Sequence, residues 1–107
     1  MAFEIILAPE ATEDLRRLSA GDRTKVREAL VVHLRHQPTK VSKSRIKRLR
    51  GLSHPQYRLR VDEVRVFYDV VDQEVQVVAI VAKSDADDWL REKGKPDENG
   101  PAVGSEG

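Results

Sequence analysis

Three arginines, Arg58, Arg60 and Arg65, lie in a segment whose β-branched and aromatic residues predict two successive strands. Side chains alternate between the two faces of a strand, so Arg58 and Arg60 share one face. If Val61 pairs with Val64 across a two-residue turn, Arg60 lies opposite Arg65 on that face. A guanidinium group stays charged at physiological pH and binds two phosphate oxygens at once. The spacing therefore predicts a phosphate-binding face on a β-hairpin.

The pairing of Arg60 with Arg65 calls for a compensating ligand. Like charges directly opposite in an antiparallel pair destabilise a sheet by about 0.2–1 kcal/mol, so sheet stability alone does not favour this pair. A bound phosphodiester would offset the repulsion. The alternative is a solvated face whose arginines pair with Asp69, Glu74 or the acidic C-terminal tail.

Basic residues are concentrated in the middle of the chain, although the formal net charge is only +1. Residues 40–65 contain nine Lys and Arg against two acids, whereas the other 81 residues contain ten Lys and Arg against sixteen acids. A positive segment against a negative background is typical of a protein that binds a polyanion. The loop before the hairpin adds three basic residues that either extend this surface or only keep the loop soluble: Lys47, Arg48 and Arg50.

The N-terminal part of the chain predicts a strand followed by two helices. Alternating apolar residues over 3–7 indicate the strand, and Pro9 suits the first turn of a helix. Asp22 is a candidate N-cap for a second helix, which Pro38 ends. A short turn joins the helices, so we expect them to pack as a hairpin on one face of a sheet. The first helix has an apolar stripe at Ala11, Leu15 and Leu18.

The C-terminal part predicts three strands and a last helix. Residues 57–61, 64–71 and 74–82 are rich in β-branched side chains and are separated by two-residue turns, which is typical of an antiparallel meander. Ser84 is a candidate N-cap for a short helix that ends at Lys93. The order β-α-α-β-β-β-α predicts an α+β fold: an antiparallel sheet with an N-terminal helical hairpin and a short C-terminal helix.

Domain boundaries follow from length and composition. A chain of 107 residues holds one domain, which we place at residues 1–93. Residues 94–107 are rich in Gly, Pro and acids without apolar periodicity, so we expect a disordered tail. Residues 39–54 predict a basic loop, with a strand or turn near residues 46–49.

Composition also excludes several kinds of chemistry. The chain contains no cysteine, so disulfides and thiolate catalysis cannot occur. Its histidines, His33, His36 and His54, lack the spacing of metal ligands, and we expect no metal and no other cofactor. No apolar run approaches the roughly 20 residues that span a bilayer, and the N-terminus lacks a basic signal-peptide region. We therefore expect a cytoplasmic protein with no membrane partner.

Three segments together resemble a known family. "KRLRGL" at residues 47–52, "YRLRVDEVRVFYDVV" at 57–71 and "VQVVAIVAK" at 75–83 resemble the RelE/ParE superfamily of bacterial toxins from toxin-antitoxin modules. The family pattern is a basic turn with glycine, a basic alternating strand, an Arg-containing strand that ends in Tyr, and a closing strand. With the preceding helices, the resemblance covers residues 3–90.

The resemblance implies a site and a reaction. The RelE branch is a ribosome-dependent endoribonuclease of mRNA, in which an RNA 2′-hydroxyl attacks the adjacent phosphate without a metal. Arg65 matches the phosphate-stabilising arginine of the family, and Arg58 and Arg60 match two basic positions that are often lysines. Arginine is a poor general base, so phosphate binding is better supported here than proton transfer. Lys83 is the candidate proton donor, and Lys47, Arg48 and Arg50 are the candidate RNA-binding residues.

The resemblance also implies a partner and leaves alternatives open. The partner is an antitoxin with an acidic amphipathic helix, and the targets are the ribosome and mRNA. The ParE branch instead inhibits DNA gyrase, and a nuclease-dead RNA-binding homologue is a third reading. The family often carries a C-terminal Tyr, which is missing here; Trp89 could stack on a base, although a core position is favoured.

Three further residues have two readings each. Tyr68 is interpreted as a core residue with its hydroxyl satisfied, in preference to an active-site residue. His54 could transfer a proton near neutral pH, but a surface histidine is the favoured interpretation. His33 falls on the apolar stripe of the second helix and is interpreted as a partly buried residue.

Overall fold

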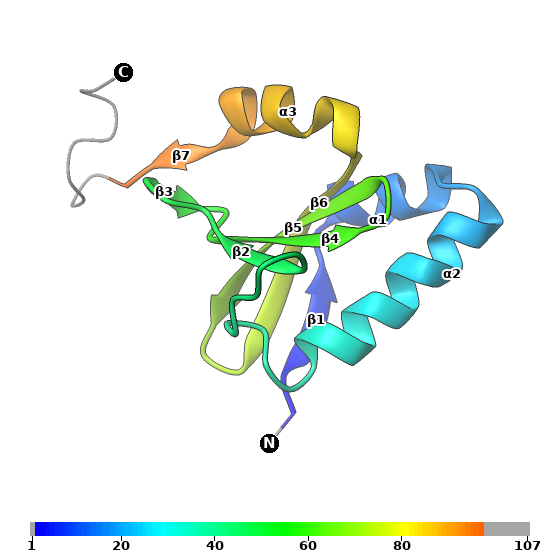
Figure 1. The fold of residues 1–107 in the computed structure, drawn as a ribbon, viewed down its shortest axis with the longest axis horizontal. Helices are drawn as coiled ribbons and strands as arrows, with labels where there is room; N and C mark the ends of the chain where they lie inside the picture. The colour runs from blue at the N-terminus through cyan, green and yellow to red at the C-terminus, as the bar shows by residue number, and fades with distance from the viewer. Residues whose placement is uncertain (1, 98–107) are drawn as a thin grey trace.

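The computed structural model describes residues 2–97, which form a twisted sheet with helices on both faces (Figure 1). No helix in this described part is long and apolar enough to span a membrane. A π-helical turn, Leu30–Leu34, extends α2, and a 3₁₀ turn, Lys83–Asp85, precedes α3. The other elements are β1 (Glu4–Leu7), α1 (Pro9–Arg17), α2 (Ala20–Ala29), β2 (Ile46–Arg48), β3 (Leu52–His54), β4 (Tyr57–Val61), β5 (Val64–Val71), β6 (Glu74–Ala82), α3 (Ala86–Lys93) and β7 (Lys95–Pro96).

The central sheet has the strand order β1-β6-β5-β4-β2. Strands β4, β5 and β6 form the predicted antiparallel meander with the predicted bounds. Strand β1 is the exception to the antiparallel pattern, because it pairs in parallel with β6 at one edge. The parallel pairing arises because α1 and α2 carry the chain away from β1 before the meander returns beside it.

Aspartates make the two tight turns of the meander. Asp62 has a φ of 51° and Asp72 a φ of 55°, both in the left-handed region. Asp enters this region more readily than most residues because its short polar side chain can bond the local backbone. The Asp-Glu turn therefore preserves the pairing of Val61 with Val64.

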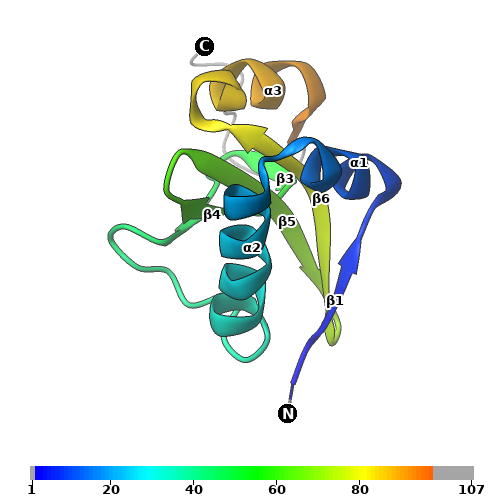
Figure 2. The ribbon, with the colours of Figure 1, turned by 90° about the vertical axis from the view of Figure 1, so that its right-hand side faces the viewer.

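The two N-terminal helices cover one face of the sheet (Figure 2). Pro9 is the first residue of α1, as predicted. The prediction of Asp22 as N-cap of α2 is wrong: Ser19 is the N-cap, and its hydroxyl accepts a hydrogen bond from the Asp22 backbone N–H at 3.2 Å. Arg23 then fastens α2 to the end of α1 by donating to the carbonyls of Leu15 and Leu18 at 3.3 and 2.9 Å.

The main core lies between these helices and the sheet. Tyr68 is fully buried there, and its hydroxyl donates to the Pro38 carbonyl at 2.6 Å, which confirms the interpretation as a core residue. Its ring stacks on Tyr57 with centroids 5.4 Å apart. The core is aliphatic around this pair and includes Ala11, Leu15, Val26, Leu30, Leu34, Ile46, Leu59, Val66, Val75, Val77 and Ile80.

A smaller apolar cluster lies on the opposite face, beneath α3. Phe67 and Ala79 of the sheet contact Ala86 of α3 there. Trp89 stacks on Phe67 with ring centroids 5.0 Å apart and planes 7° apart, as the core interpretation of Trp89 predicted. The predicted N-cap Ser84 lies instead within the 3₁₀ turn, and α3 starts at Ala86.

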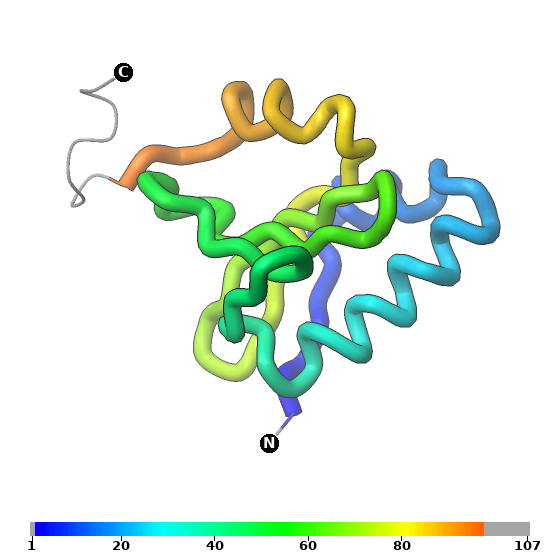
Figure 3. The backbone as a smooth tube through the Cα atoms, in the orientation of Figure 1, coloured from blue at the N-terminus to red at the C-terminus, as the bar shows by residue number. Residues whose placement is uncertain are grey.

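A short ribbon joins the end of the chain to the segment after β2. Strands β3 and β7 pair antiparallel, with Leu52 opposite Pro96. Figure 3 shows the backbone leaving α3 and returning beside β3. Lys95 and Pro96, which were expected in the tail, therefore belong to a strand. The rest of the predicted tail, residues 98–107, lies outside the described residues.

Candidate functional site

The register of β2, β4 and β5 places four basic residues on one face of the sheet. Arg60 pairs with Arg65 and Arg58 with Phe67, as predicted, and Lys47 of β2 pairs with Arg58. Directly paired residues share a face, so Lys47, Arg58, Arg60 and Arg65 all lie on the side opposite the main core. We call these four residues the cationic face.

Burial differs strongly among these four residues. Arg65 is only 7% exposed, and its Nη1 donates to the carbonyls of Asp62 and Val64 at 2.8 and 3.1 Å. Arg58 is half-buried, and its Nε is a buried donor without a hydrogen-bond partner. Arg60 and Lys47 are exposed. Arg65 therefore braces the turn and adds charge, while the other residues can reach a ligand.

No carboxylate in residues 2–97 lies within 4.0 Å of the charged nitrogens of the cationic face. Asp69, an expected partner, instead contacts His54 and the Gln56 backbone N–H. Glu74, the other, accepts from the Gln76 amide at 3.1 Å. Burial lowers the pKa of Arg58, and the neighbouring charges of Arg65 and Arg60 lower it further. Among residues 2–97, the positive charge of the cationic face is therefore not neutralised by a carboxylate.

Lys83 lies at the Arg65 end of this face. Its backbone N–H donates to the Glu63 carbonyl at 2.8 Å, which fixes the residue beside the β4–β5 turn. Val81, two residues earlier, is the register partner of Arg65. The side chain of Lys83 is exposed. The structure thus brings the candidate proton donor to the edge of the cationic face.

The three candidate RNA-binding residues separate in the structure. Lys47 belongs to the cationic face. Arg48 instead donates to the carbonyls of Leu49 and Gln56 at 3.1 and 2.8 Å, and its guanidinium lies 5.3 Å from the centroid of the Tyr57 ring. Arg50 is exposed. Arg48 therefore supports the local fold, and Lys47 and Arg50 are free to contact a polyanion.

A His–Asp pair lies on the same face and was not selected from the sequence. His54 Nδ1 contacts Asp69 Oδ2, and Asp69 Oδ1 accepts from the Gln56 backbone N–H at 2.7 Å. Asp69 is 6% exposed. The available signal was the position of Asp69, because an acid within an apolar strand needs a partner when it is buried. His54 is partly exposed, as the favoured interpretation of a surface histidine expected, but the contact with Asp69 holds its ring in place.

His54 also lines a cavity of about 320 Å³ beneath α3. Trp89 and Val78 form part of its wall, and Glu10, Lys93 and Lys95 supply its charged groups. Among residues 2–97, no group of three His, Asp or Glu side chains is arranged to hold a metal ion. The cavity is therefore lined by one aromatic ring and by more cations than acids, and no residue of the cationic face lines it.

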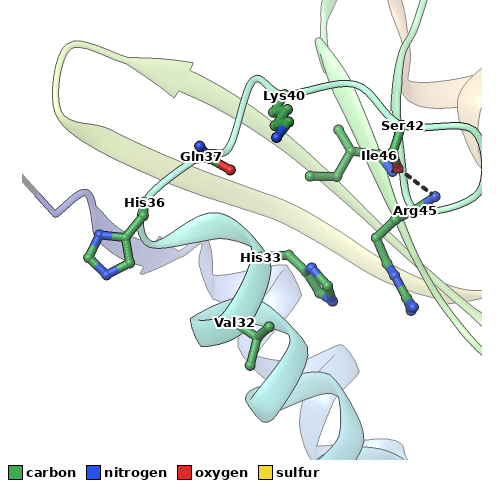
Figure 4. Close-up of a pocket in the computed structure, with 8 residues that line it drawn as sticks. All are labelled: Val32, His33, His36, Gln37, Lys40, Ser42, Arg45 and Ile46. Atoms are coloured by element: carbon green, nitrogen blue, oxygen red, sulfur yellow. Dashed lines mark hydrogen bonds between the residues drawn. The ribbon is translucent and has the colours of Figure 1, made fainter.

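A second cavity of about 320 Å³ opens between the π-helical turn and the loop before β2 (Figure 4). His33, His36, Lys40 and Arg45 supply its charged or titratable groups. Burial lowers the pKa of His33, and the nearby charge of Arg45 lowers it further. His33 is half-buried, in agreement with its interpretation from the sequence. This cavity is lined by the end of the α2 segment and lacks every residue of the cationic face.

A family model matches most of the chain and identifies its family. The model of the family described as "ParE toxin of type II toxin-antitoxin system, parDE" matches residues 5–87. The chain belongs to this ParE toxin family. It is therefore a toxin of a type II toxin-antitoxin system, and the matched residues include the whole meander and the cationic face. No curated protein matches the toxin significantly in sequence.

Solved structures of RelE toxins share the fold of this ParE-family toxin. The RelBE2 toxin-antitoxin complex from Mycobacterium tuberculosis matches with a TM-score of 0.66 and 20% identity over 77% of this chain and 99% of that chain. The archaeal RelE–RelB complex from Pyrococcus horikoshii matches with a TM-score of 0.64 and 20% identity, covering 78% and 97%. A free mutant of the Escherichia coli toxin RelE gives a TM-score of 0.64 and 24% identity, covering 86% and 94%. The fold is therefore RelE-like.

Proposed function

We propose that this toxin is a ribosome-dependent endoribonuclease that cuts mRNA in the cytoplasm and so inhibits translation. The observation that carries the proposal is the cationic face, where Arg60 opposes Arg65 and no carboxylate in residues 2–97 neutralises either. Repulsion between Arg60 and Arg65 destabilises the unbound protein, and a phosphodiester bound between them would compensate this cost. The RelE-like fold supports the same reading.

The proposed reaction is attack of an RNA 2′-hydroxyl on the adjacent phosphate. Negative charge develops on the phosphorane oxygens, and fixed cations that bind this charge more strongly than the ground state lower the barrier. Arg58 and Arg60 supply these cations, and Arg65 adds its field while it braces the turn. Lys83, at the edge of the face, is the proton donor for the leaving 5′-oxygen.

RNA outside the scissile phosphate would bind the surrounding basic surface. Lys47 and Arg50 are exposed and provide phosphate contacts, and Arg48 positions the loop that carries them. Such contacts release counterions, so their contribution decreases as salt concentration rises. The ribosome would present the mRNA to this surface.

The proposed partner is a cognate antitoxin with an acidic amphipathic helix. Two of the similar solved structures are toxin-antitoxin complexes, from M. tuberculosis and P. horikoshii. An acidic helix that covers the cationic face would neutralise it and exclude RNA. The antitoxin would thus inhibit the toxin by occupying the site itself.

Inhibition of DNA gyrase is the second candidate function. Two observations favour it: the matching family is described by its ParE toxin, and Arg65 is buried and bonded to the backbone. A gyrase inhibitor needs a binding surface and no proton-transfer groups. Replacement of the exposed Arg60 should then leave toxicity largely intact.

The two functions are separated by expressing the toxin and its Arg60→Ala variant in bacterial cells. Arg17 is an exposed arginine of α1, remote from β4 in sequence, and Arg17→Ala is the matched control. The nuclease proposal predicts growth arrest with wild type and control, relief with Arg60→Ala, and no effect of purified toxin on DNA supercoiling by gyrase. Inhibition of supercoiling by both wild type and Arg60→Ala would overturn the nuclease proposal in favour of gyrase.

A further inference from the structure

The three arginines of the cationic face cannot accept a proton. Attack of the 2′-hydroxyl requires a base at its oxygen, in addition to cations at the phosphate. Arg58, Arg60 and Arg65 are guanidinium groups, which do not deprotonate in proteins. Lys83 is the candidate proton donor and lies beside Glu63, at the other end of the face from Asp69. The arginines therefore do not supply the base of the proposed reaction.

His54 has the hydrogen-bonding arrangement of such a base. Its Nδ1 contacts the buried carboxylate of Asp69, which can only accept a hydrogen bond when it is ionised. The proton of a neutral imidazole is therefore held on Nδ1, and the lone pair remains on Nε2. Asp69 is itself fixed, because its other oxygen accepts from the Gln56 backbone N–H at 2.7 Å.

Sheet register places this pair beside the cationic face. Arg58 pairs with Phe67, and Asp69 lies two residues further along β5 on the same face. Arg58 and Asp69 are thus diagonal neighbours, with Cα atoms roughly 7–8 Å apart. His54 extends from Asp69 into the cavity that Trp89 also lines. One RNA strand can therefore contact Arg58 with a phosphate and reach His54 with the neighbouring ribose.

We infer that His54, oriented by Asp69, is the general base of RNA cleavage, an inference that rests on the nuclease function proposed above. Nε2 of His54 takes the proton of the 2′-hydroxyl while the 2′-oxygen forms a bond to phosphorus. The bond from phosphorus to the 5′-oxygen breaks, and that oxygen takes a proton from water in place of Lys83, because Lys83 lies at the Glu63 end of β5, roughly 20 Å along the strand from Asp69. The products are a 2′,3′-cyclic phosphate and a 5′-hydroxyl. Asp69 is a positioning residue, since it acts through His54.

Charged groups from four elements, β5, α1, α3 and β7, lie around His54. Asp69 of β5 contacts the ring directly, and Glu10 of α1, Lys93 of α3 and Lys95 of β7 line the cavity. A general base acts in its unprotonated form, so the cleavage rate should increase with pH and then level off. A purely structural His54 would not produce this dependence.

The test is single-turnover cleavage of a defined mRNA on purified ribosomes, measured as a function of pH. Replacement of His54 by Gln should lower the rate about 100-fold to 10,000-fold and remove the rise with pH. Asp69→Asn should lower the rate by disturbing the tautomer, and His36→Gln, at an exposed histidine outside this cavity, should match wild type. For a His54→Gln protein that folds poorly, His54→Ala supplies the second variant, and added imidazole should restore part of its rate.

The outcomes distinguish the two proposals. Cleavage by wild type with an unchanged rate and pH profile in folded His54→Gln overturns the base assignment and leaves the nuclease function standing. A His54→Ala variant that imidazole does not rescue, together with a flat wild-type pH profile, overturns it as well. No cleavage by wild type on ribosomes overturns the nuclease function and the base assignment together.

Discussion

Tyr68 shows how one buried hydroxyl can hold a loop on the sheet. Its O–H donates to the Pro38 carbonyl at 2.6 Å and thereby connects β5 to the segment that follows the π-helical turn. Burial raises the pKa of Tyr68 well above its usual value, and the neighbouring Tyr57 raises it further. The hydroxyl therefore stays protonated and remains a donor throughout the physiological range.

Replacement of Tyr68 by Phe should lower the free energy of unfolding by about 1–2 kcal/mol, because a buried carbonyl loses its donor. Tyr57→Phe is the matched control, since the Tyr57 hydroxyl makes no hydrogen bond to any residue in the described range 2–97. Urea unfolding followed by circular dichroism measures both variants. Equal stability of the two variants would contradict a structural role for the hydroxyl of Tyr68.

Replacement of Arg60 should raise the free energy of unfolding, because the charge of Arg60 destabilises the folded protein when no ligand is bound. Arg60→Gln removes the repulsion with Arg65 and should raise the free energy of unfolding by about 0.2–1 kcal/mol. The gain should shrink in high salt, which screens exposed charges. Thermal unfolding at low and high salt checks this, with Arg17→Gln as control. A destabilised Arg60→Gln would show that Arg60 has a stabilising contact instead.

At the scale of elements, the strongly periodic strands were predictable and the short ones were not. Strands β4, β5 and β6 are rich in β-branched residues and are separated by turns that begin with Asp, so both their bounds and the Arg60–Arg65 pairing follow from the sequence. Strands β3 and β7 have three and two residues and no apolar period. The parallel pairing of β1 depends on where the helices carry the chain, which local patterns do not record.

The contact between α1 and β6 illustrates such a tertiary effect. Asp14 of α1 accepts a hydrogen bond from the Ile80 backbone N–H at 3.0 Å, next to the irregularity in the β5–β6 register. Asp14→Ala leaves this N–H without its partner and should lower the free energy of unfolding by about 1–3 kcal/mol. Glu13→Ala, which removes only an exposed ion pair with Arg16, is the control. Similar chemical denaturation midpoints for the two variants would refute the role of Asp14.

At the scale of the whole molecule, the sequence indicated the fold class, the open cationic face and its segregation from the acidic residues. It did not indicate the His54–Asp69 contact, because the pair is separated by fifteen positions and depends on the path of the backbone between β3 and β4. It also overestimated the accessibility of Arg65, whose guanidinium turns back to the carbonyls of its own turn. The alternation of side chains along a strand assigns a residue to one face of the sheet, but it does not show which atoms the end of a long side chain contacts.

Global stability should decrease in mild acid because of His33. Burial and the charge of Arg45 lower the pKa of His33 in the folded state, so the unfolded chain binds more protons. The contribution of neutral His33 to stability is fully present above the pKa that His33 has in the unfolded chain. It is lost as pH decreases toward the lower pKa that His33 has in the folded protein. Urea unfolding between about pH 7.5 and pH 5 should show a smaller loss in His33→Gln than in wild type. An identical pH dependence in both proteins would exclude His33 as a source.

The nuclease proposal is tested most directly by primer extension on a defined mRNA in a translation extract. Purified wild type, Arg60→Ala and Arg17→Ala are compared, with and without ribosomes. We expect cuts at ribosome-occupied codons with wild type and Arg17→Ala, no cuts without ribosomes, and cleavage about 100-fold slower with Arg60→Ala. An intact message with wild-type protein that still arrests growth, or equal cleavage by Arg60→Ala, would contradict phosphate binding by the cationic face as the basis of toxicity.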